Sequence, residues 1–182
     1  MIYFFGLGNP GEKYNKTRHN AGFMFINFLA EKLWGLQVKF SEQSRLWAQT
    51  LKEQNLLLAK PTTFMNESGQ AVQAVTAYYK DGAAALGKNL VVVHDDLDLE
   101  LGTCKLQFGR GPKTHNGLQS VYQVLKTDQF WHLRLGIDSR GGDRSIPPSN
   151  YVLAKMTKDD LIEMKQSFVQ AAQLLQQQDL LN

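Results

Sequence analysis

Histidine, aspartate and asparagine residues in this sequence are spaced so that they could act together on a carbonyl group. A neutral histidine can take a proton from water near pH 7, and a carboxylate on its other ring nitrogen stabilises the imidazolium that forms. Asparagine adds N–H donors and a C=O acceptor without adding charge. Such residues occur in five short segments: Gly8-Asn9-Pro10, Thr17-Arg18-His19-Asn20, Phe64-Met65-Asn66, His94-Asp95-Asp96 and Thr114-His115-Asn116-Gly117.

The elements that must position these segments follow from the hydrophobic periodicity of the chain. Short apolar or alternating runs predict strands over residues 2–7, 45–51, 56–59, 90–93, 103–108 and 132–137. The strand over 90–93 is expected to be central and to stop at His94. Apolar residues at helical spacing predict helices over 20–34, 68–80, 117–126 and about 158–178, the last opened by a capping box at Thr157. A loop rich in glycine, proline and serine is expected over 139–150.

Strands that alternate with helices predict an α/β fold. We expect a single-domain sandwich in which a central mixed, largely parallel twisted sheet is flanked by helices, with antiparallel strands where residues 45–59 pair. The 182 residues contain no linker and no break in composition. One domain spanning residues 1–182 is therefore expected, with a C-terminal helix at about 158–178.

The five polar segments could meet at one place in such a fold. Four of them follow predicted strands, and the segment with His19 shares its connection with Asn9. Ligands of open α/β sheets bind outside the carboxyl ends of the strands. Each asparagine could instead cap a helix or form a turn, and the pattern does not separate Asp95 from Asp96. The convergence of these residue types favours a functional site, in which a histidine could be the general base of a hydrolase.

Several other enzyme classes lack their motifs. The segment Gly6-Leu7-Gly8-Asn9-Pro10-Gly11 has the glycine spacing of dinucleotide-binding folds, and Glu31 follows at the expected distance. That fingerprint also requires a helix directly after the last glycine, but residues 12–18 have no apolar stripe. The chain has no Gly-x-Ser-x-Gly elbow, Walker loop or paired metal ligands, so neither a cofactor nor a metal is expected.

Charge and composition bear on partners and compartment. The net charge of +3 is modest, but residues 101–127 contain four basic residues and no acidic one, here called the basic strip: Lys105, Arg110, Lys113 and Lys126. The strip could bind a polyanion or could be a solvated loop face. The chain has no apolar run long enough to cross a membrane and no basic leader, and its single Cys104 fits a reducing compartment. A cytoplasmic protein without a membrane partner is expected.

The motifs resemble those of bacterial peptidyl-tRNA hydrolase from residue 2 to about residue 153. The blocks that carry the resemblance are Gly6-Leu7-Gly8-Asn9-Pro10-Gly11, Tyr14, Thr17-Arg18-His19-Asn20-Ala21-Gly22, Pro61-Thr62-Thr63-Phe64-Met65-Asn66, Ser68-Gly69, His94-Asp95-Asp96-Leu97-Asp98 and His115-Asn116-Gly117-Leu118. The resemblance implies a monomeric, cofactor-free α/β enzyme whose partner is peptidyl-tRNA. Its reaction would be hydrolysis of the ester that joins a peptide, or an N-blocked amino acid, to the 3′ end of tRNA, which frees the tRNA for reuse.

The same resemblance implies a role for individual residues. The catalytic histidine falls on His19, and the aspartate that supports it falls on Asp95, a choice that the residue pattern alone leaves open. Substrate-binding and cleft-lining positions fall on Asn9, Tyr14, Met65, Asn66 and Asn116. The tRNA-binding positions are Arg134, which matches a phosphate-binding arginine of the family, and Lys105, Arg110 and Lys113 of the basic strip.

Three places depart from the family pattern, and all concern phosphate binding. Gln107 stands where relatives often carry a phosphate-binding lysine, and Gln119 replaces a common basic residue. Residues 109–114 are bulkier and more basic than usual. The alternative to an enzyme is a non-catalytic RNA-binding relative, although such a protein would not need to keep His19, Asp95 and the three asparagines.

Overall fold

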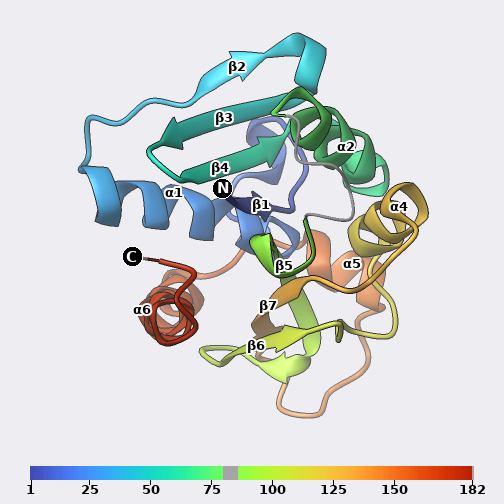
Figure 1. Cartoon of the computed structure of the whole chain (residues 1–182). Helices are drawn as coiled ribbons and strands as arrows, with labels where there is room; N and C mark the ends of the chain where they lie inside the picture. Colours follow the sequence, from blue (N-terminus) through green and yellow to red (C-terminus); the bar gives the residue numbers. More distant parts are fainter. Residues whose placement is uncertain (80–85, 182) are drawn as a thin grey trace.

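A computed structural model describes residues 1–79 and 86–181 and contains one mixed sheet (Figure 1). The strand order is β2-β3-β4-β1-β5-β7-β6. The strands are β1 (Ile2–Gly6), β2 (Ser41–Gln43), β3 (Ala48–Glu53), β4 (Leu56–Pro61), β5 (Leu90–Glu100), β6 (Cys104–Phe108) and β7 (Trp131–Asp138). The central strands β4, β1, β5 and β7 pair in parallel, whereas β2, β3 and β6 add antiparallel pairs at the edges. The predicted fold class is confirmed.

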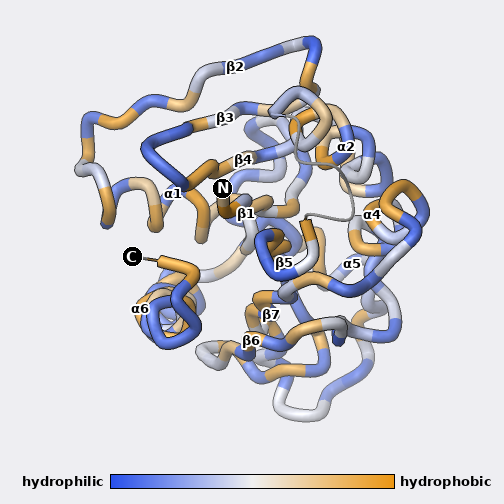
Figure 2. The backbone as a smooth tube through the Cα atoms, in the orientation of Figure 1, coloured by the Kyte–Doolittle hydropathy of each residue, from blue (hydrophilic) through white to orange (hydrophobic). Residues whose placement is uncertain are grey.

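Helices cover both faces of the sheet because successive side chains of a strand point to opposite faces. Phe4 of β1 packs in a core cluster with Phe25 of α1 (Ala21–Trp34) and Phe168 of α6 (Lys158–Gln177). Its neighbour Tyr3 belongs to a second cluster with Val72 of α2 (Ser68–Tyr78) and residues of α4 (Asn116–Leu125). Figure 2 shows apolar residues concentrated along the central strands between these layers.

The C-terminal helix begins where the sequence predicts. Thr157 Oγ1 accepts a hydrogen bond from the backbone N–H of Asp160, and Asp160 Oδ2 accepts one from the N–H of Thr157, which completes a capping box. α6 ends at Gln177, one residue short of the prediction. In the described part of the chain, neither α6 nor any shorter helix has the length and apolar character of a membrane span.

The central strand β5 is longer than predicted. The sequence predicts an end at His94, but pairing with β7 continues through Asp95↔Leu135 and Asp96↔Gly136, and after an irregularity β5 pairs again at Glu100. Backbone hydrogen bonds of a ladder do not depend on side-chain polarity, so the polar residues after Val93 can stay within the strand. His94, Asp95 and Asp96 are therefore held by the sheet itself rather than by a loop after it.

Other boundaries also differ from the prediction. The loop expected over 139–150 ends earlier, because Pro148 opens a short helix, α5 (Pro148–Leu153). Proline is well suited to the first turn of a helix, but six residues are too few to show helical periodicity. β2 and the single-turn 3₁₀ helices were not predicted, for the same reason. The helix predicted to reach Lys80 ends at Tyr78, and Lys80 lies outside the described residues.

Helix α1 lies unusually close to the sheet at Gly22. A Cβ atom on Gly22 would lie 2.5 Å from backbone atoms of Leu7 and Val93. Only glycine permits this approach without displacing β1 or β5. The contact holds the residues immediately before α1, including His19, against the carboxyl ends of the two central strands.

Candidate active site

His19 and Asp95 form a buried hydrogen-bonded pair. His19 lies in the 3₁₀ turn η2 (Arg18–Asn20) directly before α1, and its Nδ1 lies 2.8 Å from Oδ1 of Asp95 on β5. An ionised carboxylate can only accept a hydrogen bond, so Nδ1 carries the proton and donates it. Nε2 of His19 therefore keeps a free lone pair, which is the arrangement that a general base requires.

The environment of the pair favours its charged forms. Burial disfavours the imidazolium of His19, but the charge and hydrogen bond of Asp95 outweigh it, and the pKa of His19 is raised above its ordinary 6.5. Burial also disfavours the Asp95 carboxylate, but His19 and His115 outweigh it, and the pKa of Asp95 is held far below its ordinary value. Asp95 is thus a carboxylate wherever His19 is neutral.

His115 is a second histidine on the same carboxylate, and the sequence did not predict a role for it. Its Nε2 lies 3.0 Å from Asp95 Oδ1, and its Nδ1 accepts a hydrogen bond from the backbone N–H of Leu118 at 3.3 Å. Because Nδ1 is an acceptor, the proton of the neutral ring is on Nε2, which donates to Asp95. His115 is also the N-cap residue of α4, so the helix fixes its position. Its place directly before Asn116 was the available signal.

All four histidines of the chain lie in one buried row. The ring centroids are 5.0 Å apart for His19 and His115, 5.3 Å for His115 and His94, and 5.7 Å for His94 and His132. Burial lowers the pKa of His94 well below 6.5 and lowers that of His132 to about 4, so both are neutral at pH 7. We call these four residues the histidine row.

The structure separates the two aspartates that the sequence pattern could not. Adjacent strand residues face opposite sides of the sheet, so Asp96 points away from His19. Asp96 Oδ2 accepts a hydrogen bond from Arg134 Nε at 2.7 Å, and Arg134 Nη1 donates to Gln107 Oε1 at 2.7 Å. Asp95 therefore serves His19, and Asp96 neutralises Arg134. The guanidinium of Arg134 is held by protein side chains at the position where the sequence predicts a phosphate contact.

Asn9 is fixed in one orientation by its neighbours. Its backbone N–H and C=O both bond the side chain of Asn20, at 2.9 Å each, and its Oδ1 accepts from the N–H of Met65 at 2.9 Å. The side-chain N–H groups are therefore what Asn9 can offer to a substrate. Asn20, which could have capped α1, bonds Asn9 instead and ties the first strand's connection to the turn that carries His19.

Several of the residues predicted to form the site line one of two cavities. A cavity of about 220 Å³ is lined by His19, Asp95, His115 and Asn116, together with Pro148, Ser149 and Val152 of α5. Asn9 lines a second cavity of the same volume with Asn20.

The other predicted residues differ in exposure. Met65 is buried against Gly117, and Asn66 is exposed. The ring of Tyr14 lies 6.5 Å from that of Phe64. The residues expected to meet in one crevice thus line two cavities, one at His19 and one at Asn9. The hydrogen bond between Asn9 and Met65 links two of the segments that carry them.

The ligand atoms of His19, Asp95 and His115 all lie within 4.8 Å of one another, which is close enough to consider a metal ion. The ring nitrogens that face Asp95 already donate hydrogen bonds to it, whereas a metal ligand must offer a lone pair. Hydrogen bonds to Asp95 thus account for the clustering of these three side chains.

Comparison with known proteins identifies the group to which this site belongs. A family model described as peptidyl-tRNA hydrolase matches residues 3–180. The chain belongs to the peptidyl-tRNA hydrolase family. The resemblance seen in the motifs is confirmed, and it extends past residue 153 into α6.

Relatives in the peptidyl-tRNA hydrolase family match most of the chain. The enzyme of Lawsonia intracellularis is 44% identical over 172 residues, covering 90% of this chain and 79% of the relative. That of Alkaliphilus metalliredigens is 38% identical over 172 residues, covering 94% and 89%. The crystal structure of peptidyl-tRNA hydrolase from Acinetobacter baumannii has a TM-score of 0.79 at 30% identity, covering 98% of this chain and 90% of that one. Fold and family thus agree.

The positions that the sequence predicts to bind tRNA lie on β6, on β7 and on the connection from β6 to α4. Lys105 lies on β6 directly across from Arg134 on β7, and Arg110 and Lys113 lie on the connection from β6 to α4. Unlike Arg134, which forms an ion pair with Asp96, the other three predicted side chains are exposed: Lys105, Arg110 and Lys113. Cys104, also on β6, is half-buried, and burial raises the pKa of its thiol to about 11, so it is not a reactive thiolate.

Proposed function

We propose that this chain hydrolyses the ester between a peptide, or an N-blocked amino acid, and the 3′ end of tRNA, with His19 as the general base. The observation that carries the proposal is the 2.8 Å hydrogen bond between His19 Nδ1 and Asp95, which leaves Nε2 free at the cavity. Membership of the peptidyl-tRNA hydrolase family supports the substrate. The geometry supports the role of His19.

The reaction needs one activated water and no other reagent. His19 Nε2 takes a proton from water while the oxygen forms a bond to the ester carbonyl carbon. The imidazolium that results is stabilised by Asp95. When the tetrahedral intermediate collapses, the bond to the ribose 3′ oxygen breaks, and His19 returns its proton to that oxygen. The products are tRNA with a free 3′ hydroxyl and a peptide carboxylic acid, which releases its proton to solvent and becomes a carboxylate.

Three asparagines are proposed to bind the substrate around this centre. Asn9 offers N–H groups because its Oδ1 is occupied by Met65, so it suits a carbonyl oxygen of the peptide or the developing oxyanion. Asn116 lines the cavity of His19 and follows His115 directly. Asn66 is exposed beside Met65, with Tyr14 near the same edge through its contact with Phe64. Because the three asparagines lie at different places, they support contacts at several points along the peptide rather than at a single atom.

The phosphates of the tRNA are proposed to lie along Lys105, Arg110 and Lys113. These side chains are exposed and lie on β6 and the loop that leads to the catalytic cavity. Arg134 is proposed to contribute less than the other three, because Asp96 offsets its charge and Gln107 occupies one of its N–H groups. Gln107, where relatives often carry lysine, thus orients an arginine instead of contacting a phosphate.

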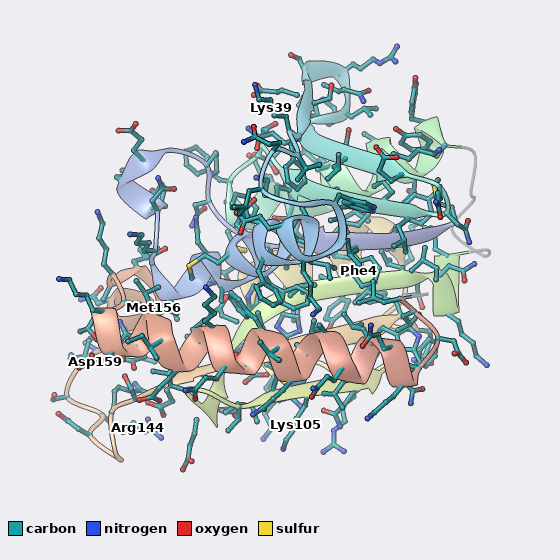
Figure 3. All side chains as sticks on the ribbon, turned by 90° about the vertical axis from the view of Figure 1, so that its left-hand side faces the viewer. Phe4, Lys39, Lys105, Arg144, Met156 and Asp159 are labelled. Atoms are coloured by element: carbon teal, nitrogen blue, oxygen red, sulfur yellow. The ribbon has the colours of Figure 1, made fainter. Side chains whose placement is uncertain are left out.

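The proposal is tested by incubating the protein with an N-blocked aminoacyl-tRNA and with its unblocked counterpart. We expect only the blocked substrate to be consumed efficiently. The variant His19→Ala should lose at least about 10²-fold in turnover while it still binds tRNA, the low end of what general-base catalysis contributes. The control is Lys39→Ala, which changes an exposed residue far from Lys105 of the predicted tRNA contact (Figure 3). This variant should keep both cleavage and tRNA binding. Normal cleavage by a folded His19→Ala protein would refute the role of His19, and binding without cleavage by the wild type would indicate the non-catalytic alternative.

A further inference from the structure

Arg18, the residue before His19, holds several distant segments together. Its guanidinium is buried, with a side chain only 8% exposed. Nη2 donates to Asp160 Oδ2 of α6 at 2.8 Å and to Ser139 Oγ after β7 at 3.2 Å. Nη1 donates to the backbone oxygen of Lys155 at 3.1 Å. These contacts do not involve the reacting atoms, and the mechanism above does not use them.

Arg18 also stacks on Tyr151, whose ring contacts two guanidiniums. The guanidinium carbons of Arg18 and Arg140 lie 4.4 and 4.5 Å from the centre of the Tyr151 ring. The Tyr151 hydroxyl accepts from the N–H of Ser139 at 2.9 Å and donates to the backbone oxygen of Ile137 at 3.1 Å. A guanidinium stacks well on an aromatic face, and the attraction grows when the pair is removed from water. Tyr151 therefore has little freedom to move.

Tyr151 belongs to α5, which forms part of the wall of the catalytic cavity. Pro148, Ser149 and Val152 of this short helix line the same cavity as His19. The backbone continues the connection, since Arg18 N–H donates to Ala154 at 3.1 Å. The turn that carries His19 and the wall formed by α5 are thus joined by the Arg18 side chain in addition to backbone hydrogen bonds.

From this geometry we infer that Arg18 is a positioning residue that sets the distance between His19 and the α5 wall. The inference rests on the proposed function and deepens it. An ester held between His19 and α5 must lie within about 3–3.5 Å of the activated water, and misplacement by about 1 Å can cost on the order of 10²-fold in rate. A lysine could keep the ion pair with Asp160 but not the planar stacking and the fork of donors. Arginine is therefore required at this position.

The test compares Arg18→Lys with Thr157→Ala, a variant at the same junction that removes the cap of α6 and leaves Arg18 and Tyr151 in contact. Cleavage of N-blocked aminoacyl-tRNA gives kcat and KM, and hydrogen exchange reports the amide protection of residues 148–154. For Arg18→Lys we expect kcat to fall by about 10-fold and protection of α5 to fall with it. The acid limb of the pH–rate profile should not move, because the His19–Asp95 pair is intact. Thr157→Ala should change neither kcat nor α5 protection.

Unchanged kcat and unchanged protection in a folded Arg18→Lys protein would overturn the inference. An equal loss of kcat in Thr157→Ala would also overturn it, because a general loosening of the junction would then suffice. Tyr151→Leu gives the same test from the other partner and should reproduce the loss, whereas Tyr151→Phe keeps the ring that both guanidiniums contact and should lose less. A fully active His19→Ala protein would refute the role of His19 instead, and a wild-type protein that binds tRNA without cleaving it would refute the proposed function; both results are independent of α5 protection.

Discussion

His115 donates a hydrogen bond to the same Asp95 oxygen that accepts from His19, at 3.0 and 2.8 Å respectively. The carboxylate is thus held between two imidazoles, one at the turn before α1 and one at the N-terminus of α4. Its position relative to His19 depends on both helices. This relationship gives the first prediction.

Replacement of His115 by alanine should weaken catalysis without abolishing it. A hydrogen bond to a charged group contributes about 1.5–3 kcal/mol, so kcat/KM should fall by roughly 10- to 100-fold if the bond is fully used in the transition state. Asp95 would then act on His19 alone, so the acid limb of the pH–rate profile should move to higher pH. Steady-state cleavage of N-blocked aminoacyl-tRNA measures both effects. A loss as large as that of His19→Ala, or a limb that moves to lower pH, would contradict this account.

Activity should fall as pH falls through the raised pKa of His19, because only the neutral imidazole can take a proton from water. The midpoint of the acid limb should therefore lie above the ordinary 6.5. In Asp95→Asn the charge that raises the pKa is lost and burial dominates, so the limb should move to lower pH while the plateau drops by up to about 10⁴-fold. A pH–rate profile of kcat/KM decides the point. An acid limb at the same pH in both proteins would show that another group titrates.

Stability should decrease in acid because His94 and His132 are neutral in the fold but charge on unfolding. For His132 the pKa is about 4 in the fold against 6.5 when unfolded, so the unfolded state binds more protons between these values and stability falls as pH falls through that window. The loss for this residue is of the order of 3 kcal/mol. Urea unfolding from pH 7 to pH 4 measures it. His132→Phe should flatten the curve, and an equally steep curve in that variant would assign the effect elsewhere.

Affinity for tRNA should depend on salt through three side chains. The triple variant Lys105→Ala, Arg110→Ala, Lys113→Ala should bind tRNA more weakly, and the slope of log K against log salt should decrease by about 2–3. Lys39→Ala, which removes one exposed charge far from Lys105, is the control and should leave the slope unchanged. Arg134→Gln should reduce the slope less than removal of any one of the other three. If the slope is the same in the triple variant and the wild type, the basic strip is not the tRNA contact.

Gly22→Ala should destabilise the fold where α1 meets the sheet. The new Cβ would lie 2.5 Å from backbone atoms of Leu7 and Val93, which cannot yield without moving β1 or β5. Overpacking of this kind costs about 1–3 kcal/mol, or more where only backbone is available to move. Gly87→Ala is the matched control, because the nearest atom to its Cβ would be 3.9 Å away. Denaturant midpoints should fall for the first variant and remain nearly constant for the second.

The sequence predicted the fold class and most elements because their signals are local. Hydrophobic periodicity identified β1, β5 and α1, and the capping box at Thr157 located the start of α6. The five polar segments were also visible, because each follows or precedes a periodic element. The extension of β5 past His94 and the short helix α5 were not visible, because the first depends on pairing with β7 and the second is too short for a period.

The parts of the site that the sequence could not predict are relationships between distant residues. Asp95 and Asp96 are adjacent and chemically identical, and only the direction in which each faces in β5 assigns one to His19 and the other to Arg134. The contact of His115 could not be predicted, because its partner is a carboxylate 20 residues earlier in the sequence. The orientation of the Asn9 amide could not be predicted either, because it is set by the hydrogen bond that its oxygen accepts from the N–H of Met65.

The histidine row has a practical consequence for spectroscopy. Every imidazole of the chain is buried in this row, so no exposed histidine adds signals to its NMR spectrum. Each imidazole proton resonance in an NMR titration will therefore arise from His19 and His115 at the cavity or from His94 and His132 behind them. A substrate analogue that enters the cavity can be followed through native signals alone, without a label.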